Sequence, residues 1–316
     1  MMSTVTVIIV NYNSGKMLWR CLSAVEQQSV QPDEILVVDN ASEDHSLECL
    51  SNWPNVSVIK MEQNIGFAKA NNIALEQIST DFVALVNPDA FPERRWLESL
   101  LEAAIVNPAF GSFASFQLKD DEMDVIDGLG DCIHVSGYVW RRRHGKKVSF
   151  SDNLSRQVFS ACAGAALYRT HVVKQVGAFD EKFFCYCEDV DLGFRLQLAG
   201  YRCLFVPDAK IKHIGSAITG QNSTFTIYHG HRNLIFVLFK NVPASVLPIV
   251  IPLHLIVTLI LFAVYARRGK LGVLLKAKLD ALKMLPLFFE SRRLIQRSRQ
   301  ITFWETLKIF CIKPLM

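Results

Sequence analysis

The chain has 316 residues, of which 50% are hydrophobic and 20% are charged. This length and composition exclude an intrinsically disordered protein, and they fit one large α/β domain with an appendage or two modest domains. The net charge of +4 conceals an asymmetry, because residues 1–265 carry 22 Lys and Arg against 27 acidic residues, whereas residues 266–316 carry 12 against three.

The beginning of the chain and its cysteines both indicate a cytosolic origin. The first residues, MMSTVTVIIVNYNS, lack a basic region and contain only a short apolar run that is typical of a strand, so no secretory signal is predicted. The eight cysteines are scattered without a CxxC pair, and we therefore expect reduced thiols and no disulfide framework.

Short apolar runs alternate with helical stretches over residues 1–90. The runs predict strands at 5–10, 34–39, 56–61 and 82–87, with helices near 15–28, 43–51 and 66–78. Strands separated by helices of this length imply right-handed βαβ units and a parallel sheet. Residues 1–90 are therefore predicted to form a nucleotide-binding half.

Polar segments follow each of these four strands, at 11–14, 39–42, 64–72 and 87–90. Ligands of such sheets bind outside the carboxyl ends of the strands, so these segments predict a binding site. No GxGxxG and no GxxxxGK[ST] is present, which argues against a dinucleotide-dependent dehydrogenase and a P-loop NTPase. A divalent cation could instead hold a diphosphate, and Asp89, stiffened by Pro88, is placed to bind it.

The second half begins with an amphipathic helix at 94–104, and we expect an irregular region from there to about residue 158. Further on, the segment FFCYCEDVDLGFRLQLAGYR (183–202) sets three carboxylates directly before a helix, with a strand expected at 201–207. Acidic residues in a first helical turn cap the helix and meet its dipole. Capping needs one or two such residues, so a chemical role for the others stays open at this point.

The C-terminal part of the chain combines apolar and basic residues. Residues 247–265 are an almost unbroken apolar run of nearly the length of a spanning helix, with basic residues on both sides. A spanning, re-entrant or in-plane helix and a buried core helix are the alternatives, and the mixed segments that follow favour membrane association. We find no nucleic-acid recognition motif and expect no nucleic-acid partner.

Taken in order, these segments resemble the family 2 glycosyltransferases, and most closely their rhamnosyltransferase-like branch. The matching segments span about residues 5–243: VIIVNYNSG, ILVVDNASED, NIGFAKANN, LVNPDA, CAGAALYR, VGAFDEKFFCYCEDVDLGFRLQLAGYR, IKHIGSA and YHGHRNLIFVLFKNVP. The resemblance implies a GT-A fold with a mostly parallel central sheet flanked by helices over residues 1–243, divided into a nucleotide-binding half (1–90) and an acceptor half (91–243). Residues 244–316 would form a hydrophobic and basic membrane-associating tail.

The resemblance also implies a nucleotide-sugar donor and a divalent cation, Mg²⁺ or Mn²⁺. Asp89 matches the last residue of the family's metal-binding DxD, in which Asn87 replaces the first acid, and His213 matches a further metal ligand. The positions implied in donor binding are Asn11, Asn13, Asp39, Asn64, Gly66, Asn71 and Asn87.

Asp189 matches the general base of the family, which inverts the anomeric carbon. An acceptor hydroxyl must lose its proton as it attacks, and a carboxylate within hydrogen-bond reach can take that proton. Glu188, Asp191 and Arg195 are then expected to orient the acceptor. Alternatively, the two acids cap the helix or pair with Arg195, which lies one turn beyond Asp191.

The predicted function is transfer of one sugar, with dTDP-L-rhamnose implied as the donor, to a polysaccharide or lipid-linked glycan on the cytoplasmic side of the cell membrane. The enzyme would be peripheral or would hold one hydrophobic segment in the membrane, and removing residues 244–316 would release it. The alternative is a catalytically silent, glycosyltransferase-like protein that binds a nucleotide or glycan at the membrane; Asp189→Asn discriminates the two.

Overall fold

The computed structural model describes residues 3–122, 124–215, 217–218, 220 and 222–312. Its centre is a mixed sheet with the strand order β10-β12-β6-β11-β4-β1-β2-β3, to which β5 adds beside β12 and β7 beside β6; β8 and β9 form a separate pair. The strands are β1 (Val5–Asn11), β2 (Glu34–Asp39), β3 (Ser57–Lys60), β4 (Phe82–Val86), β5 (Ala90–Pro92), β6 (Phe110–Lys119), β7 (Ile126–Gly128), β8 (Asp131–Ile133), β9 (Val139–Arg141), β10 (Arg156–Val158), β11 (Ala165–Arg169) and β12 (Arg202–His213).

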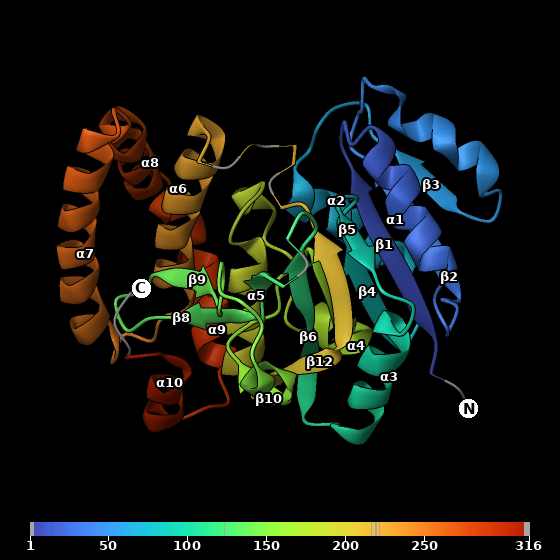
Figure 1. The fold of residues 1–316 in the computed structure, drawn as a ribbon. Helices are drawn as coiled ribbons and strands as arrows, with labels where there is room; N and C mark the ends of the chain where they lie inside the picture. Colours follow the sequence, from blue (N-terminus) through green and yellow to red (C-terminus); the bar gives the residue numbers. More distant parts are fainter. Residues whose placement is uncertain (1–2, 123, 216, 219, 221, 313–316) are drawn as a thin grey trace.

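Helices cover both faces of this sheet (Figure 1). The α-helices are α1 (Lys16–Glu26), α2 (Phe67–Gln77), α3 (Trp96–Val106), α4 (Thr170–Gln175), α5 (Glu188–Leu198), α6 (Thr224–Asn241), α7 (Leu247–Arg267), α8 (Leu271–Met284), α9 (Phe289–Ser298) and α10 (Phe303–Ile309). Short 3-10 helices are η1 (His45–Asn52), η2 (Phe150–Asn153), η3 (Glu181–Phe183) and η4 (Leu285–Phe288).

Residues 1–90, the predicted nucleotide-binding half, have the predicted βαβ order. Strands β3, β2, β1 and β4 pair in parallel, and the register places Asn11 directly beside Asp39 at their carboxyl ends. Two hydrophobic clusters, one on each face, bury β1 and β4 completely. Burial on both faces explains why these strands are continuous apolar runs in the sequence.

The region expected to be irregular up to residue 158 is structured, so that prediction is wrong. It contains β6, a ten-residue strand at the centre of the sheet, together with β7 to β10. Its sequence, FGSFASFQLK, carries polar side chains at positions that the fold buries, among them Ser115, which accepts a hydrogen bond from the indole of Trp96 at 2.8 Å. Such internal partners let polar residues occupy a core strand, and they conceal its apolar pattern.

Beyond β4 the sheet becomes mixed. Strand β11 lies antiparallel between β4 and β6, and β12 runs parallel to β6. The strand expected at 201–207 continues to His213, because β12 bulges and then pairs with β6 again. As a result, His213 reaches the same edge of the sheet as the polar strand ends of the first half.

The C-terminal helices pack against residues 91–243, the predicted acceptor half, rather than standing apart from them. A third hydrophobic cluster joins Phe183 and Phe194 near α5 to Phe236 of α6, Phe288 of η4 and Phe310 beyond α10. The predicted divisions at residues 90/91 and 243/244 stay predictions, and members of this cluster lie on both sides of the second one.

Candidate active site

The end of β1 and the end of β2 hold the first part of the site. The Asn11 amide donates to an Asp39 carboxylate oxygen at 2.9 Å, and both side chains are buried. Asn11 also donates to Ser42 and Ser46 at 3.0 and 2.9 Å. This network fixes one carboxylate at the sheet edge, as the predicted donor-binding role requires.

The neighbouring loops are tied to the same edge. Asn13, with a positive φ of 46°, accepts from the Glu43 backbone N–H at 2.8 Å, and Asn64 accepts from the Asn40 amide at 2.9 Å. Gly66 begins α2 at a φ of 85°, and a Cβ there would lie 2.6 Å from the Phe184 carbonyl oxygen. The loop before α2 therefore touches the segment that leads into α5.

The other two predicted donor-binding residues have different surroundings. Asn71 is buried in α2, where its amide donates to the carbonyl of Phe67 at 2.9 Å. This bond makes it a helix-internal residue in the structure. Asn87 is half-buried after β4, with its backbone N–H donating to Gly164 at 2.8 Å.

Asp89 and His213 come together, as predicted from the sequence. Their side chains lie 3.4 Å apart, from Asp89 Oδ1 to His213 Nε2, and both are buried. Burial opposes charge on either group, but the contact with His213 prevails at Asp89 and lowers the pKa of that carboxyl. Burial of His213 is likewise outweighed, first by its bond to Asp127, which lies 2.7 Å from Nδ1, and then by Asp89, so the pKa of the imidazole is raised.

Asp127 was not predicted from the sequence. It also forms an ion pair with Arg141, and burial fails to raise its pKa, because bonds to His144 and His213 and the charge of Arg141 lower it strongly. The only sequence features that could have pointed to Asp127 are the paired acids and glycines of its segment, IDGLGD. It lies in the region that we expected to be irregular.

Asp89 and His213 fit a hard divalent cation only in part. The described residues include no group of three or more His, Cys, Asp and Glu side chains placed to hold a metal ion. Two protein ligands nevertheless suit Mg²⁺ or a similar ion, which is usually bound through one or two carboxylates and substrate phosphates. The bond from His213 Nδ1 to a carboxylate is the usual partner arrangement for a metal-ligating imidazole.

Asp189 lies in the first turn of α5 and is half-buried. One of its oxygens accepts from the Ala163 backbone N–H at 3.0 Å and the other from the Val190 N–H at 2.8 Å. A carboxylate has about four lone-pair positions, so both oxygens can still accept from a ligand. The backbone thus fixes a carboxylate that remains accessible.

Two buried acids near Asp189, Asp131 and Glu188, have raised pKa values. Burial, followed by the charge of Asp189, raises the pKa of Asp131 to about 7 and that of Glu188 well above its usual range. Asp131 accepts from the Ser160 hydroxyl at 2.8 Å, whereas Glu188 Oε2 is buried without a hydrogen-bond partner among the described residues. Asp131 also went unnoticed in the sequence.

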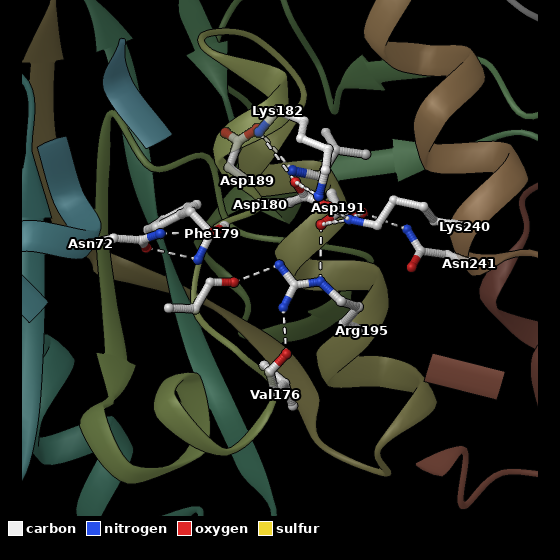
Figure 2. Close-up of polar contacts among 12 residues, drawn as sticks. Asn72, Val176, Phe179, Asp180, Lys182, Asp189, Asp191, Arg195, Lys240 and Asn241 are labelled. Carbon is white, nitrogen blue, oxygen red and sulfur yellow. Dashed lines mark hydrogen bonds and ion pairs between the residues drawn. The ribbon is translucent and has the colours of Figure 1, made fainter. Parts of the chain in front are cut away.

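Asp191 and Arg195 form an ion pair at 2.9 Å, which confirms that prediction. Figure 2 shows Asp191 also facing Lys240 and Asn241 of α6, at 2.9 and 2.8 Å. Asp191 is fully buried, and Arg195 further donates to the carbonyls of Val176 and Ala178. These contacts give the pair a structural role that joins α5 to α6, and the acceptor-orienting roles of Glu188, Asp191 and Arg195 stay predictions.

A parallel nucleotide-binding half, an antiparallel strand beside it and acidic residues at the carboxyl edge define the GT-A class of fold. The mannosyltransferase PcManGT from Pyrobaculum calidifontis, in complex with GDP-Man and Mn²⁺, shares it with a TM-score of 0.57 and 19% identity, over 94% of this chain and 84% of that chain. GalNAc-T7 with UDP, GalNAc and Mn²⁺ gives a TM-score of 0.63 and 16% identity, over 76% and 48%.

The model of glycosyl transferase family 2 matches residues 6–177, and that of glycosyl transferase family group 2 matches residues 130–228. The chain belongs to glycosyl transferase family 2 and is a glycosyltransferase.

Similar curated proteins include the N-acetylglucosaminyl-diphospho-decaprenol L-rhamnosyltransferase of Mycobacterium tuberculosis (27% identity; 74% of this chain, 83% of that protein). The O-antigen chain rhamnosyltransferase RfbN of Salmonella typhimurium is 22% identical over 66% of each chain. These relatives confirm the predicted resemblance to the rhamnosyltransferase-like branch.

Proposed function

We propose that this enzyme transfers one sugar, with inversion, from a nucleotide-diphospho-sugar to a glycan or lipid-linked acceptor, with Asp189 as the general base. The observation that carries the proposal is the fixed, accessible carboxylate of Asp189 beside two buried acids. Asp131 and Glu188 are poor candidates for the base, because both side chains are buried and an acceptor hydroxyl must come within hydrogen-bond reach of the base. Asp189 alone among the three is half-exposed.

The proposed donor is dTDP-L-rhamnose, and the proposed acceptor is a lipid-linked glycan. The names of the similar rhamnosyltransferases support both, since one of them acts on a decaprenol-linked acceptor by its name. Asp39, supported by Asn11, would bind the base or ribose of the nucleotide. The loops that carry Asn13, Asn64 and Gly66 would enclose it, and Asn71 and Asn87 would shape the pocket from α2 and from the end of β4.

During transfer, one Asp189 oxygen would take the proton of the attacking acceptor hydroxyl while the backbone N–H bonds hold the carboxylate in place. Asp89 and His213 would hold Mg²⁺ or Mn²⁺. When bound, the cation supplies positive charge to the diphosphate leaving group. The contact between the Asp89 and His213 side chains, at 3.4 Å, supports this part of the proposal.

We also place the enzyme at the cytoplasmic surface of the cell membrane. Helix α7 is the one helix among the described residues that is long and apolar enough to cross a membrane. Together with the basic residues that follow it, and with a decaprenol-linked substrate in the name of a relative, this supports a membrane location.

The test of the base is Asp189→Asn, assayed by nucleotide-diphosphate release from a panel of dTDP-, UDP- and GDP-sugars with a lipid-linked acceptor. Loss of a general base lowers kcat by about 10²- to 10⁴-fold, and donor affinity should stay within about twofold because the proposed base acts on the acceptor hydroxyl. The matched control is Asp208→Asn, which neutralises an exposed carboxylate on β12.

Transfer at the wild-type rate by Asp189→Asn would contradict the assignment of the base. Donor binding without any release by the wild-type protein, across all donors and with either cation, would instead favour the catalytically silent alternative.

A further inference from the structure

Helix α7 has the length of a transmembrane helix, but its packing is that of a surface helix. Its 21 residues extend about 31 Å, close to the thickness of a bilayer core. Only 17% of its most apolar 18-residue window is buried inside the protein. The buried residues Val250, His254 and Thr258 recur every fourth position, so one narrow stripe of the helix faces the protein.

The middle of this stripe is bonded to the globular domain. His254 Nδ1 donates to the Ser136 carbonyl at 3.0 Å, and its ring stacks on Tyr138 with 4.9 Å between centroids. The Tyr138 hydroxyl lies 3.0 Å from that of Thr258. Ser136 and Tyr138 belong to the connection between β8 and β9, so a spanning α7 would carry this polar connection to the centre of a bilayer. Lipid-exposed irregular segments do not occur in the hydrocarbon region of a bilayer.

We propose that α7 and α8 lie in the plane of an anionic lipid surface and bind it through their outward faces. This inference rests on the proposed membrane location and defines its geometry. The outward face of α7 is apolar as far as Ala266, and that of α8 alternates leucines with lysines. Their exposed large apolar residues are Ile249, Ile251, Leu255, Ile256, Leu259, Ile260, Leu275, Leu279 and Leu282.

Charge identifies a lipid surface, rather than a second copy of the chain, as the occupant. Arg267 and Arg268 end α7, and Lys276 and Lys283 lie beside the exposed leucines of α8. The one acidic residue of these two helices, Asp280, accepts from the Tyr228 hydroxyl at 2.8 Å. A second copy would oppose like charges, whereas anionic head groups complement them and apolar side chains enter the acyl region.

The same geometry connects the lipid surface to the active site. In Figure 1 the turn between α7 and α8 lies at the same end of the molecule as the start of α6 and the carboxyl ends of β1 and β12. Lys270, in this turn, donates to the carbonyl of Asn222, just before α6. A lipid-linked acceptor could therefore present its sugar to the strand-end edge while its chain stays in the bilayer.

The binding mode is tested with the full-length protein and vesicles of phosphatidylglycerol or phosphatidylcholine, in a sedimentation assay. We expect preferential binding to phosphatidylglycerol that weakens with salt, and a decrease of at least about tenfold in Leu255→Glu/Leu259→Glu, because two large apolar side chains leave the acyl region. The matched control is Ile105→Glu, at an exposed apolar position of α3, which should bind like wild type.

A second measurement distinguishes an in-plane helix from a span. Protease sites inserted after Ala244 and within the turn at Gly269 should both be cleaved from the same side of sealed membrane vesicles. Cleavage from opposite sides would overturn the proposal. Vesicle binding by the double variant at the wild-type level would also overturn it. So would self-association of the wild-type protein that is lost in the double variant, because the outward faces would then bind a second copy. Nucleotide release with a soluble acceptor should be equal in wild type and double variant, so failure of transfer is read separately from failure of membrane binding.

Discussion

Asp127 controls how His213 faces Asp89. Its carboxylate holds His213 Nδ1 at 2.7 Å, which directs Nε2 toward Asp89, 3.4 Å away, and Arg141 balances its buried charge. In the proposed cation site, Asp127 would orient the imidazole of His213 without contacting the cation itself. The resemblance implied His213 and Asp89 together, and the two side chains are in contact, but the carboxylate that fixes their geometry comes from a distant segment.

We therefore predict that Asp127→Ala weakens Mn²⁺ binding by about 10- to 100-fold, the usual cost of losing such a partner. Calorimetric titration of Mn²⁺ in the presence of the nucleoside diphosphate measures it. Asp124→Ala, which removes an exposed carboxylate from the same segment, serves as the control. The effects of Asp127→Ala and His213→Ala should be less than additive, because both act through one imidazole. If the two effects on Mn²⁺ binding were fully additive, Asp127 would not act through His213.

The loop before α2, on the proposed donor side of the site, meets the segment before α5, which leads to the proposed base Asp189. Gly66 is in close contact with Phe184, and Phe184, Tyr186 and Cys187 all have positive φ values, 66°, 70° and 63°. Such conformations cost free energy and persist only where surrounding contacts enforce them. The backbone bond from Ala68 N–H to the Phe184 carbonyl, at 3.2 Å, is one of those contacts.

Gly66→Ala should lower the free energy of unfolding by about 2–4 kcal/mol, because its Cβ adds a clash with Phe184 to the strain of a positive φ. Gly177→Ala has the same φ region but open space around its Cβ, and it should cost only about 1–2 kcal/mol. Chemical denaturation of both variants measures the difference. Equal costs would show that the contact with Phe184 carries no energy.

The elements that the sequence predicted well are those whose signal is local. Strands β1, β2 and β4 are continuous apolar runs, and Asp189 stands in a segment that resembles its family. The prediction missed strand β6 because its residues Ser112, Ser115 and Gln117 are polar but buried. Asp127 and Asp131 could not be placed, since their roles arise only when β7 and β8 meet residues of β12 and α5 in the folded chain.

At the scale of the whole molecule, the C-terminal helices complete the core of the acceptor half. Helix α9 supplies Arg292 and Gln296, which donate to the carbonyls of Val242 and Asn241 at the end of α6, at 2.8 and 2.9 Å. Phe288 is fully buried and lies 4.4 Å from Phe236, ring centre to ring centre. The tail thus satisfies backbone groups and covers apolar side chains of the part that carries Asp189.

Removing residues 244–316 should therefore do more than release the protein from membranes. The shortened chain exposes Phe183 and Phe236, and loss of the packing around a buried Phe costs about 3–5 kcal/mol, a large share of the stability of an ordinary domain. We expect the fragment 1–243 to aggregate on size-exclusion chromatography and to lose a cooperative thermal transition. In contrast, Leu255→Glu/Leu259→Glu changes only outward-facing residues and should keep the wild-type transition while losing vesicle binding. If the 1–243 fragment is monomeric and melts like the full chain, the shared core is contradicted and residues 244–316 form a separable tail.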